Sequence, residues 1–202
     1  MTQGHEVSGQ IVKVGSAVKG LSVGQKVVLE PQVTCGKCYP CTHGKYNLCS
    51  SLKVMGFRTT GAVSELFAVD ASKVDVIPNS MSYDEAALIE PLAVMVHAAK
   101  RFEGIAGGSV AIIGCGPIGI LLMQSCKALG AAKVLITDIS DYRLELAKSL
   151  GADYAINTAK VPYADAIEQV FGPDKADVIY ECAGNNATMD MAIQNSRKGA
   201  KI

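Results

Sequence analysis

Short apolar segments alternate with helical segments through the second half of the chain, and this alternation restricts the fold more than any other feature. Four segments have the length and apolar character of buried strands: Val110 to Ile113, Val134 to Thr137, Tyr154 to Ile156 and Val178 to Tyr180. The helical segments that follow them are Ile118 to Leu129, Tyr142 to Leu150, Tyr163 to Phe171 and Ala187 to Ile193. Strands that alternate with helices build βαβ units around a parallel sheet. The sequence therefore predicts an α/β fold with a doubly wound parallel sheet.

The first part of the chain has a different pattern, which is rich in strands and turns. The expected strands are Ile11 to Val14, Lys26 to Leu29 and Glu65 to Val69, with glycines between them. We therefore predict a separate β domain here.

A helical pattern begins at Ser82, which forms a potential capping box with Glu85 for a helix from Tyr83 to Ile89. Pro91 is expected to redirect the chain before a buried helix from Leu92 to Phe102. The change of pattern predicts a boundary near residues 90–105, which gives domains at 1–91 and 92–202.

A glycine-rich turn links the first predicted strand of the α/β part to its first helix. It reads Gly114-Cys115-Gly116-Pro117-Ile118-Gly119. The G-x-G-x-x-G pattern alone is a weak signal, but here it follows an apolar strand and opens a helix, as a dinucleotide site requires. Gly114 permits the tight turn, Gly116 lets the backbone approach a pyrophosphate, and Gly119 lets the helix pack on the strand. The helix N-terminus, with Pro117 in its first turn, offers unpaired N–H groups to the phosphates.

Asp138 ends the next predicted strand, about twenty residues after the glycines, where a ribose-binding acid is expected. A carboxylate there accepts hydrogen bonds from ribose hydroxyls and repels a 2′-phosphate, which favours NAD over NADP. Arg143 is a candidate to stack near the adenine. The alternative for Asp138 is a helix cap before Tyr142, a role that suits Asp141 better.

Four of the seven cysteines fall within fifteen residues, at Cys35, Cys38, Cys41 and Cys49. Four thiolates at short spacing can close a tetrahedral shell around zinc, and a closed shell makes that zinc structural. The alternative is four free buried cysteines, and His43 is the other possible ligand in the loop. The remaining cysteines, Cys115, Cys126 and Cys182, are interpreted as small buried apolar residues.

A second metal site is suggested by Gly4-His5-Glu6 and by Glu90, an acid within an apolar segment. A His-Glu pair alone would be interpreted as surface residues, but beside the two motifs above it can hold a zinc with an open position. A buried acid such as Glu90 also needs a partner. His97 is interpreted as a core histidine and is left out of the site.

Charge and targeting signals narrow the classes of partner. Nineteen basic side chains balance nineteen acidic ones, so nothing points to nucleic acid or an anionic membrane surface. No apolar run reaches the ~20 residues of a membrane span. The first residues lack a basic segment followed by an apolar stretch, and the odd number of cysteines argues against a disulfide framework. We therefore expect a cytoplasmic protein.

Together, these motifs resemble the zinc-containing medium-chain dehydrogenase/reductase family, closest to the sorbitol, polyol and related alcohol dehydrogenases. The resemblance covers essentially the whole chain. It is carried by Gly4-His5-Glu6 with Val14-Gly15, the four-cysteine loop, Glu90-Pro91-Leu92, the glycine turn with Asp138, and Glu181-Cys182-Ala183-Gly184. It implies a partial GroES-like β domain with the catalytic zinc, followed by a partial Rossmann domain that binds NAD.

The resemblance also implies roles for individual residues. His5 matches the catalytic-zinc histidine, Glu6 matches an adjacent glutamate that is a ligand in the polyol branch, and Glu90 matches a glutamate beside that zinc. The residues Cys182, Ala183 and Gly184 match a strand end near the bound dinucleotide. A homo-oligomer, either dimer or tetramer, is implied as well.

Family members have on the order of 350 residues, which are about two domains, so the resemblance implies a chain truncated at both ends. The segment expected before His5 carries the catalytic-zinc cysteine and a hydroxyl residue of the proton relay. The expected function is oxidation of a secondary alcohol or polyol to a ketone, with Phe57 and Arg58 as candidates to line the substrate site.

Three alternatives remain. The first is a non-catalytic remnant that keeps the structural zinc and NAD binding. The second is a zinc-finger module, against which the balanced charge and the βαβ half argue. The third is a quinone-reductase-like relative, but such proteins lack the cysteine loop.

Overall fold

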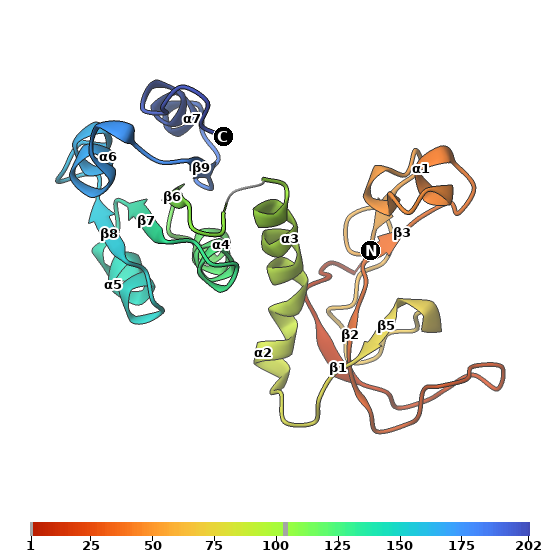
Figure 1. Cartoon of the computed structure of the whole chain (residues 1–202). Helices are drawn as coiled ribbons and strands as arrows, with labels where there is room; N and C mark the ends of the chain where they lie inside the picture. The colour runs from red at the N-terminus through yellow and green to blue at the C-terminus, as the bar shows by residue number, and fades with distance from the viewer. Residues whose placement is uncertain (1, 103–104) are drawn as a thin grey trace. The chain divides into compact units, whose positions relative to one another are not determined.

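The computed structural model describes residues 2–102 and 105–202 and divides into a first unit, Met1–Glu90, and a second unit, Pro91–Ile202 (Figure 1). The division falls one residue before the predicted boundary. Each unit has its own sheet structure and its own hydrophobic core.

The second unit contains the predicted parallel sheet, with four strands in the order β8-β7-β6-β9. Their bounds are β6 Ser109–Ile113, β7 Lys133–Asp138, β8 Tyr154–Asn157 and β9 Val178–Glu181. The chain moves outward from β6 through β7 to β8 and then returns to the other side of β6. Ligands of open α/β sheets bind at the carboxyl ends of the strands where the order reverses in this way, which here means the ends of β6 and β9.

Helices cover both faces of this sheet, as expected for a doubly wound fold (Figure 1). They are α4 Pro117–Ala128, α5 Asp141–Ser149, α6 Tyr163–Phe171 and α7 Asn186–Gln194. Successive side chains of a strand point to opposite faces. Ile112 therefore packs in one core with residues of α4 and α5, whereas Ala111 and Ile113 pack in the other with residues of α6 and α7.

The helix before the sheet begins earlier than predicted. The capping box is present: Ser82 and Glu85 cap α2, Tyr83–Ala87. The next helix, α3, runs over Ile89–Lys100 rather than from Leu92. Pro91 lies in its first turn, where a proline removes no internal hydrogen bond, so it continues the helix instead of redirecting the chain.

The first unit has two small antiparallel sheets. One has the order β1-β2-β5, with β1 Ser8–Gln10, β2 Lys26–Leu29 and β5 Val74–Val76. The other pairs β3, Gln32–Val33, with β4, Lys53–Val54. Three short helical turns also lie in this unit: α1 Tyr39–Thr42, η1 Tyr46–Leu48 and η2 Ala71–Lys73. A further turn, η3 Gly172–Asp174, belongs to the second unit.

Two of the predicted strands are wrong. Ile11 to Val14 is not a strand. The antiparallel ladder of β1 and β2 ends with the pair Gln10 and Lys26, and Lys26 is the first residue of β2, so the residues after Gln10 extend beyond that strand. Glu65 to Val69 is not a strand either, since the two sheets of this unit are built from β1, β2 and β5 and from β3 and β4. Among the described residues, no helix combines the length and apolarity that crossing a membrane requires.

Candidate functional site

The structure brings His5, Glu6 and Glu90 together, although Glu6 and Glu90 are 84 positions apart in the sequence. One ligand atom from each lies within 4.8 Å of the others. His5 Nε2 is 4.0 Å from Glu90 Oε1, and both side chains are largely buried. His5 and Glu6 precede β1, and Glu90 is held in the first turn of α3. His97, farther along α3, is exposed rather than part of the core.

The three side chains have the chemistry of a zinc site with an open position. Zinc bonds imidazole nitrogen and carboxylate oxygen at about 2.0–2.2 Å. Small inward movements of three ligand atoms that already lie within 4.8 Å of one another would place them at three corners of a tetrahedron. Burial raises the pKa of Glu90, which Glu6 raises further and His5 lowers. A cation between these groups would offset the cost of burying the carboxylate.

Phe57 lies beside this group. Its ring centroid is 5.0 Å from that of His5, at a tilt of 48°, and two-thirds of its surface is exposed. The candidate substrate-lining residue is therefore next to the predicted metal ligands.

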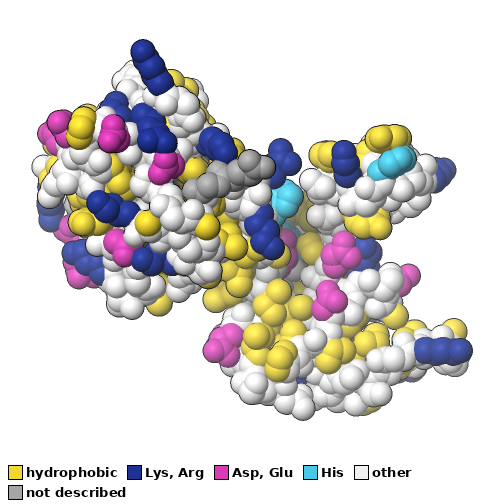
Figure 2. Space-filling view, viewed as in Figure 1, with side chains coloured by type: hydrophobic (Ala, Val, Ile, Leu, Met, Phe, Trp, Pro, Cys, Tyr) yellow, Lys and Arg dark blue, Asp and Glu magenta, His cyan; other side chains and the backbone are white. Residues whose placement is uncertain are grey.

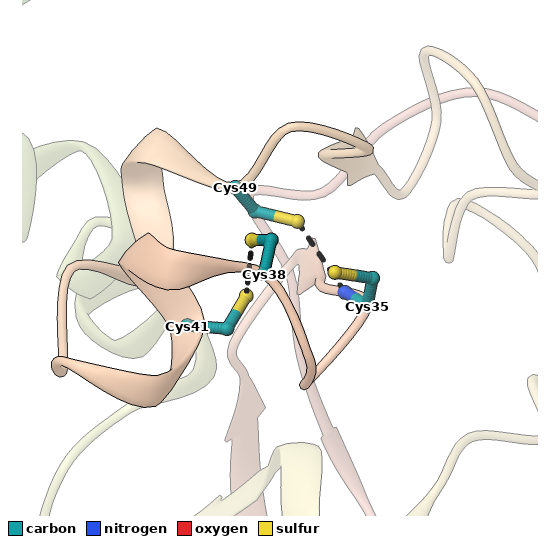
Figure 3. Close-up of side chains that lie close together, drawn as sticks. All are labelled: Cys35, Cys38, Cys41 and Cys49. Carbon is teal, nitrogen blue, oxygen red and sulfur yellow. Dashed lines mark hydrogen bonds between the residues drawn. The ribbon is translucent and has the colours of Figure 1, made fainter.

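The four clustered cysteines also come together, with their sulfur atoms within 4.8 Å of one another (Figure 3). The sulfur atoms of Cys38 and Cys41 are 3.4 Å apart. All four are free thiols, and Cys41 and Cys49 are buried. Tetrahedral zinc with Zn–S bonds of about 2.3 Å fits such a group. His43 instead stacks on Tyr39, with ring centroids 3.9 Å apart, and lies outside the ligand group.

Backbone N–H groups point at these sulfurs. Cys49 Sγ accepts hydrogen bonds from the N–H groups of Cys35 and Ser51 at 3.3 and 3.4 Å. The N–H groups of Cys41 and Ser50 lower the pKa of Cys38 to about 6. Burial raises the pKa of Cys41 to about 11. The loop is thus folded to stabilise negative sulfur. The buried Cys41 thiol resists ionisation, and a bound cation would favour its charged form.

The glycine turn lies at the carboxyl end of β6, at the reversal of strand order. Gly114 has φ +100°, and Gly116 is the N-cap of α4 with Pro117 and Ile118 as the first helical residues. A Cβ on Gly119 would lie 1.9 Å from the Gly114 carbonyl oxygen, whereas a Cβ on Gly116 would meet nothing within 4 Å. Gly119 is therefore needed for packing, and Gly116 leaves an open approach to the backbone.

Asp138 ends β7 beside this turn. Its Oδ2 accepts a hydrogen bond from the Cys115 N–H at 2.8 Å, and its Oδ1 accepts one from the Ser140 N–H at 2.9 Å. Arg143 Nη1 lies 3.7 Å from Oδ2. A carboxylate has about four lone-pair sites, so capacity remains for ribose hydroxyls. The predicted cap at Asp141 is wrong, because the N-cap of α5 is Ser140 and Asp141 instead binds Asn157 and Lys160.

The segment after β9 lies against the glycine turn. The Cys182 N–H donates to the Ile113 carbonyl at 2.8 Å, and a Cβ on Gly114 would lie 3.0 Å from Ala183 N. Gly184 follows with φ +75°. The three predicted residues Cys182, Ala183 and Gly184 thus border the proposed dinucleotide site, and burial raises the pKa of Cys182 to about 11, so its thiol stays neutral.

Sequence reasoning missed the role of Glu181. Its Oε1 accepts hydrogen bonds from the N–H groups of Ala183 and Gly184 and from the Thr188 hydroxyl, at 2.8, 3.0 and 2.8 Å. Glu181 therefore fixes the loop after β9. The available signal was an acid at the end of an apolar strand directly before small residues.

Comparison with known proteins gives two family matches. The family described as alcohol dehydrogenase GroES-like domain matches residues 1–79, and the one described as zinc-binding dehydrogenase matches residues 117–202. Sorbitol dehydrogenase of Bacillus subtilis is 40% identical over 200 residues, which are 98% of this chain and 57% of that protein. L-threonine 3-dehydrogenase of Shewanella loihica is 36% identical and covers all of this chain and 59% of its own length.

A solved structure has the same arrangement of the chain. An oxidoreductase/dehydrogenase of unknown specificity from Escherichia coli superposes with a TM-score of 0.94 at 36% identity, over 99% of this chain and 58% of that one. This chain thus spans somewhat more than half the length of these relatives.

Proposed function

The chain belongs to the zinc-containing medium-chain dehydrogenase/reductase family, and on this premise we propose that it serves NAD-dependent oxidation of a secondary alcohol or polyol to a ketone. The relatives named sorbitol dehydrogenase and L-threonine 3-dehydrogenase support this class of substrate, in which the reacting carbon bears a hydroxyl group. The observation that carries the proposal is the group formed by His5, Glu6 and Glu90.

Among the described residues this group offers three ligand side chains, and a zinc held by three side chains keeps a position for an alcohol oxygen. A zinc bound there would act as a Lewis acid and lower the pKa of an alcohol at its open position. His5 and Glu6 would hold the ion, and Glu90, 4.0 Å from His5 Nε2, would orient the imidazole or join the shell. The exposed ring of Phe57 would form an apolar wall beside the reacting carbon.

Features of the second unit support NAD as the cofactor. The N-terminus of α4 would bind the pyrophosphate through Gly116 and the first turn. Asp138 would bind the ribose hydroxyls and disfavour a 2′-phosphate, which supports NAD. The four-cysteine group would hold a structural zinc, because four thiolates leave no position for a substrate.

The first test measures the number of zinc ions bound per polypeptide, by elemental mass spectrometry of the purified chain. We expect two zinc ions in the wild type and one in each of the variants His5→Asn and Cys41→Ser. The matched control is His97→Asn, which changes an exposed histidine on α3 and should keep two. NAD reduction is then assayed with sorbitol and L-threonine.

One zinc in the wild type, with NAD binding but no alcohol-dependent reduction, would identify a binding protein and refute the proposed activity. A nucleic-acid function would require binding to random DNA at moderate salt. The mixture of acidic and basic side chains over the face in Figure 2 supports the absence of such a partner.

A further inference from the structure

The segment that carries His5 is hydrogen-bonded to a loop that follows the four-cysteine segment in the sequence. Three consecutive N–H groups of this clamp loop, residues 56–63, donate to carbonyl groups just before His5. The Gly61 N–H donates to Thr2 at 2.7 Å, the Ala62 N–H to Gly4 at 3.0 Å, and the Val63 N–H to Gln3 at 3.2 Å. The clamp loop therefore fixes the backbone from which His5 and Glu6 project.

Glycines make this contact possible. A Cβ on Gly61 would lie 2.5 Å from the carbonyl carbon and oxygen of Gln3, and one on Gly56 would lie 2.5 Å from Gly4 N. A Cβ on Gly4 would in turn lie 2.1 Å from Val63 Cγ2. Ordinary contact begins at 3.4 Å, so the two backbones are closer than any side chain permits.

The clamp loop also reaches the imidazole itself. Phe57, between the two glycines of the loop, contacts the His5 ring. Its N–H donates to the Val54 carbonyl at 3.1 Å, and the Gly56 N–H donates to Thr59 at 2.9 Å, so the loop is tied to β4 and closed on itself. Backbone and ring of His5 are thus located by the same loop.

We propose that Gly56 and Gly61 are positioning residues for the metal site of His5, Glu6 and Glu90. This inference rests on the proposed function, because it assumes that these side chains hold a metal. Metal–ligand distances tolerate changes of about 0.2 Å. Adding a Cβ at Gly61 would separate the backbones by roughly 1 Å from the 2.5 Å contact, since ordinary contact begins at 3.4 Å. His5 and Glu6 would then shift relative to Glu90, which lies in the first turn of α3.

Gly61→Ala tests the proposal because its effect is steric only. Gly61 has no positive φ, whereas Gly56 has φ +79° and would add backbone strain. The matched control is Gly9→Ala, in β1 of the same unit, where a Cβ meets nothing within 4 Å and φ is not positive. The apo chains are titrated with Co²⁺, and binding is followed by absorption, since cobalt bound by thiolates gives an intense sulfur charge-transfer band that a nitrogen and oxygen site lacks.

We expect Gly61→Ala to bind the cobalt of the nitrogen and oxygen site roughly 10- to 100-fold more weakly, with an altered ligand-field spectrum. The thiolate band should keep its wild-type midpoint, and Gly9→Ala should match the wild type at both sites. Equal affinity of Gly61→Ala and wild type at the nitrogen and oxygen site would overturn the positioning role. Loss of both sites in Gly61→Ala would also overturn it, because the loop would then support folding alone. A wild type that binds only thiolate cobalt refutes the proposed metal site itself, which is a different result.

Discussion

At the scale of single residues, Asp138 has a structural role beside the binding role proposed for it. Its carboxylate accepts hydrogen bonds from Cys115 and Ser140, so it holds the glycine turn in place before any cofactor binds. The side chain is only 7% exposed, and Arg143 lies at its edge. Because these hydrogen bonds already hold the carboxylate in place, it would need little reorganisation to bind ribose hydroxyls.

We predict that Asp138→Asn reduces the preference for NAD over NADP by roughly 10- to 100-fold, the equivalent of one charge-assisted hydrogen bond of about 1.5–3 kcal/mol. The amide keeps the shape and one acceptor but no longer repels a 2′-phosphate. Dissociation constants of both cofactors, measured by fluorescence titration, give the ratio. Asp141→Asn is the control, because Asp141 is nearby at the start of α5 but binds Asn157 and Lys160. An unchanged ratio in Asp138→Asn would remove Asp138 from the cofactor site.

The residues of the site were predictable to different degrees. The cysteines at 35, 38, 41 and 49 come from one short segment, so local spacing was enough to indicate their grouping. His5 and Glu90 are distant in the chain, so their grouping was inferred from the context of the two other motifs, and their individual roles came from the family resemblance. The acid at position 181 ends an apolar strand, but its role depends on how the following loop folds back onto the carboxyl group, which the sequence indicates only weakly.

At the scale of elements, we expect the last two glycines of the glycine turn, Gly116 and Gly119, to have separate roles in binding and in packing. We predict that Gly119→Ala lowers the free energy of unfolding by about 1–3 kcal/mol or more, as expected for overpacking, because its Cβ would lie 1.9 Å from the Gly114 oxygen. Gly116→Ala should unfold like the wild type but bind NAD at least about tenfold more weakly, since its Cβ enters the space that the pyrophosphate approaches. Urea denaturation and NAD titration of both variants measure the two effects. Equal loss of stability in both would contradict this division of roles.

A second element-scale feature joins β6 to the start of β9. Asp177 Oδ2 accepts hydrogen bonds from the Ser109 hydroxyl and N–H at 2.6 and 2.7 Å, and Arg197 pairs with its Oδ1. The Ser109 hydroxyl and N–H lower the pKa of Asp177, with a smaller contribution from Arg197. A lowered pKa stabilises the fold above the unfolded-state pKa of about 3.9 and loses this effect as the pH falls through the folded-state value.

We therefore predict that Asp177→Asn costs about 1–2 kcal/mol of unfolding free energy at pH 7, in the range of hydrogen bonds to a charged group. The difference from wild type should shrink as the pH falls below about 4. Asp174→Asn, at an exposed position in η3, serves as the control. Urea unfolding at a series of pH values gives the curve, and a difference that stays constant down to pH 3 would show that the charge of Asp177 does not matter.

Elements of the second unit were predicted more accurately than those of the first. The bounds of α6 agree with the prediction, and the sheet strands differ by one residue at most at each end. These strands are buried on both faces, so their apolar runs are unambiguous. In the first unit, β2 agrees fully, but Ile11 to Val14 and Glu65 to Val69 have strand-like composition without a partner strand in the described sheet. Strand propensity is local, whereas pairing depends on which segment lies alongside.

At the scale of the whole molecule, the two units differ in what stabilises them. The second unit has two hydrophobic cores on the faces of its sheet. The first has a small buried cluster of Val28, Ile77 and Ala86, with Met81 and Ile89 packed against it. Small cores are commonly supplemented by a structural metal. The homo-oligomer implied by the family resemblance stays a prediction, which light scattering of the purified chain would test.

The small core of the first unit predicts that its stability depends on the metal of Cys35, Cys38, Cys41 and Cys49. Structural zinc contributes about 10–16 kcal/mol of apparent binding free energy in zinc-finger peptides, which is more than such a core is expected to supply. A chelator should therefore lower the melting temperature of residues 1–90 and leave that of residues 91–202 unchanged.

Saturating NAD should instead stabilise the second unit and leave the first unchanged, adding about 2.7 kcal/mol to the second unit at one hundred times the dissociation constant of NAD. Calorimetry detects the two transitions, and hydrogen exchange by mass spectrometry assigns each to its unit. A single transition that moves with both reagents would mean that the two units unfold together, and their separate cores would then not behave as separate folding units.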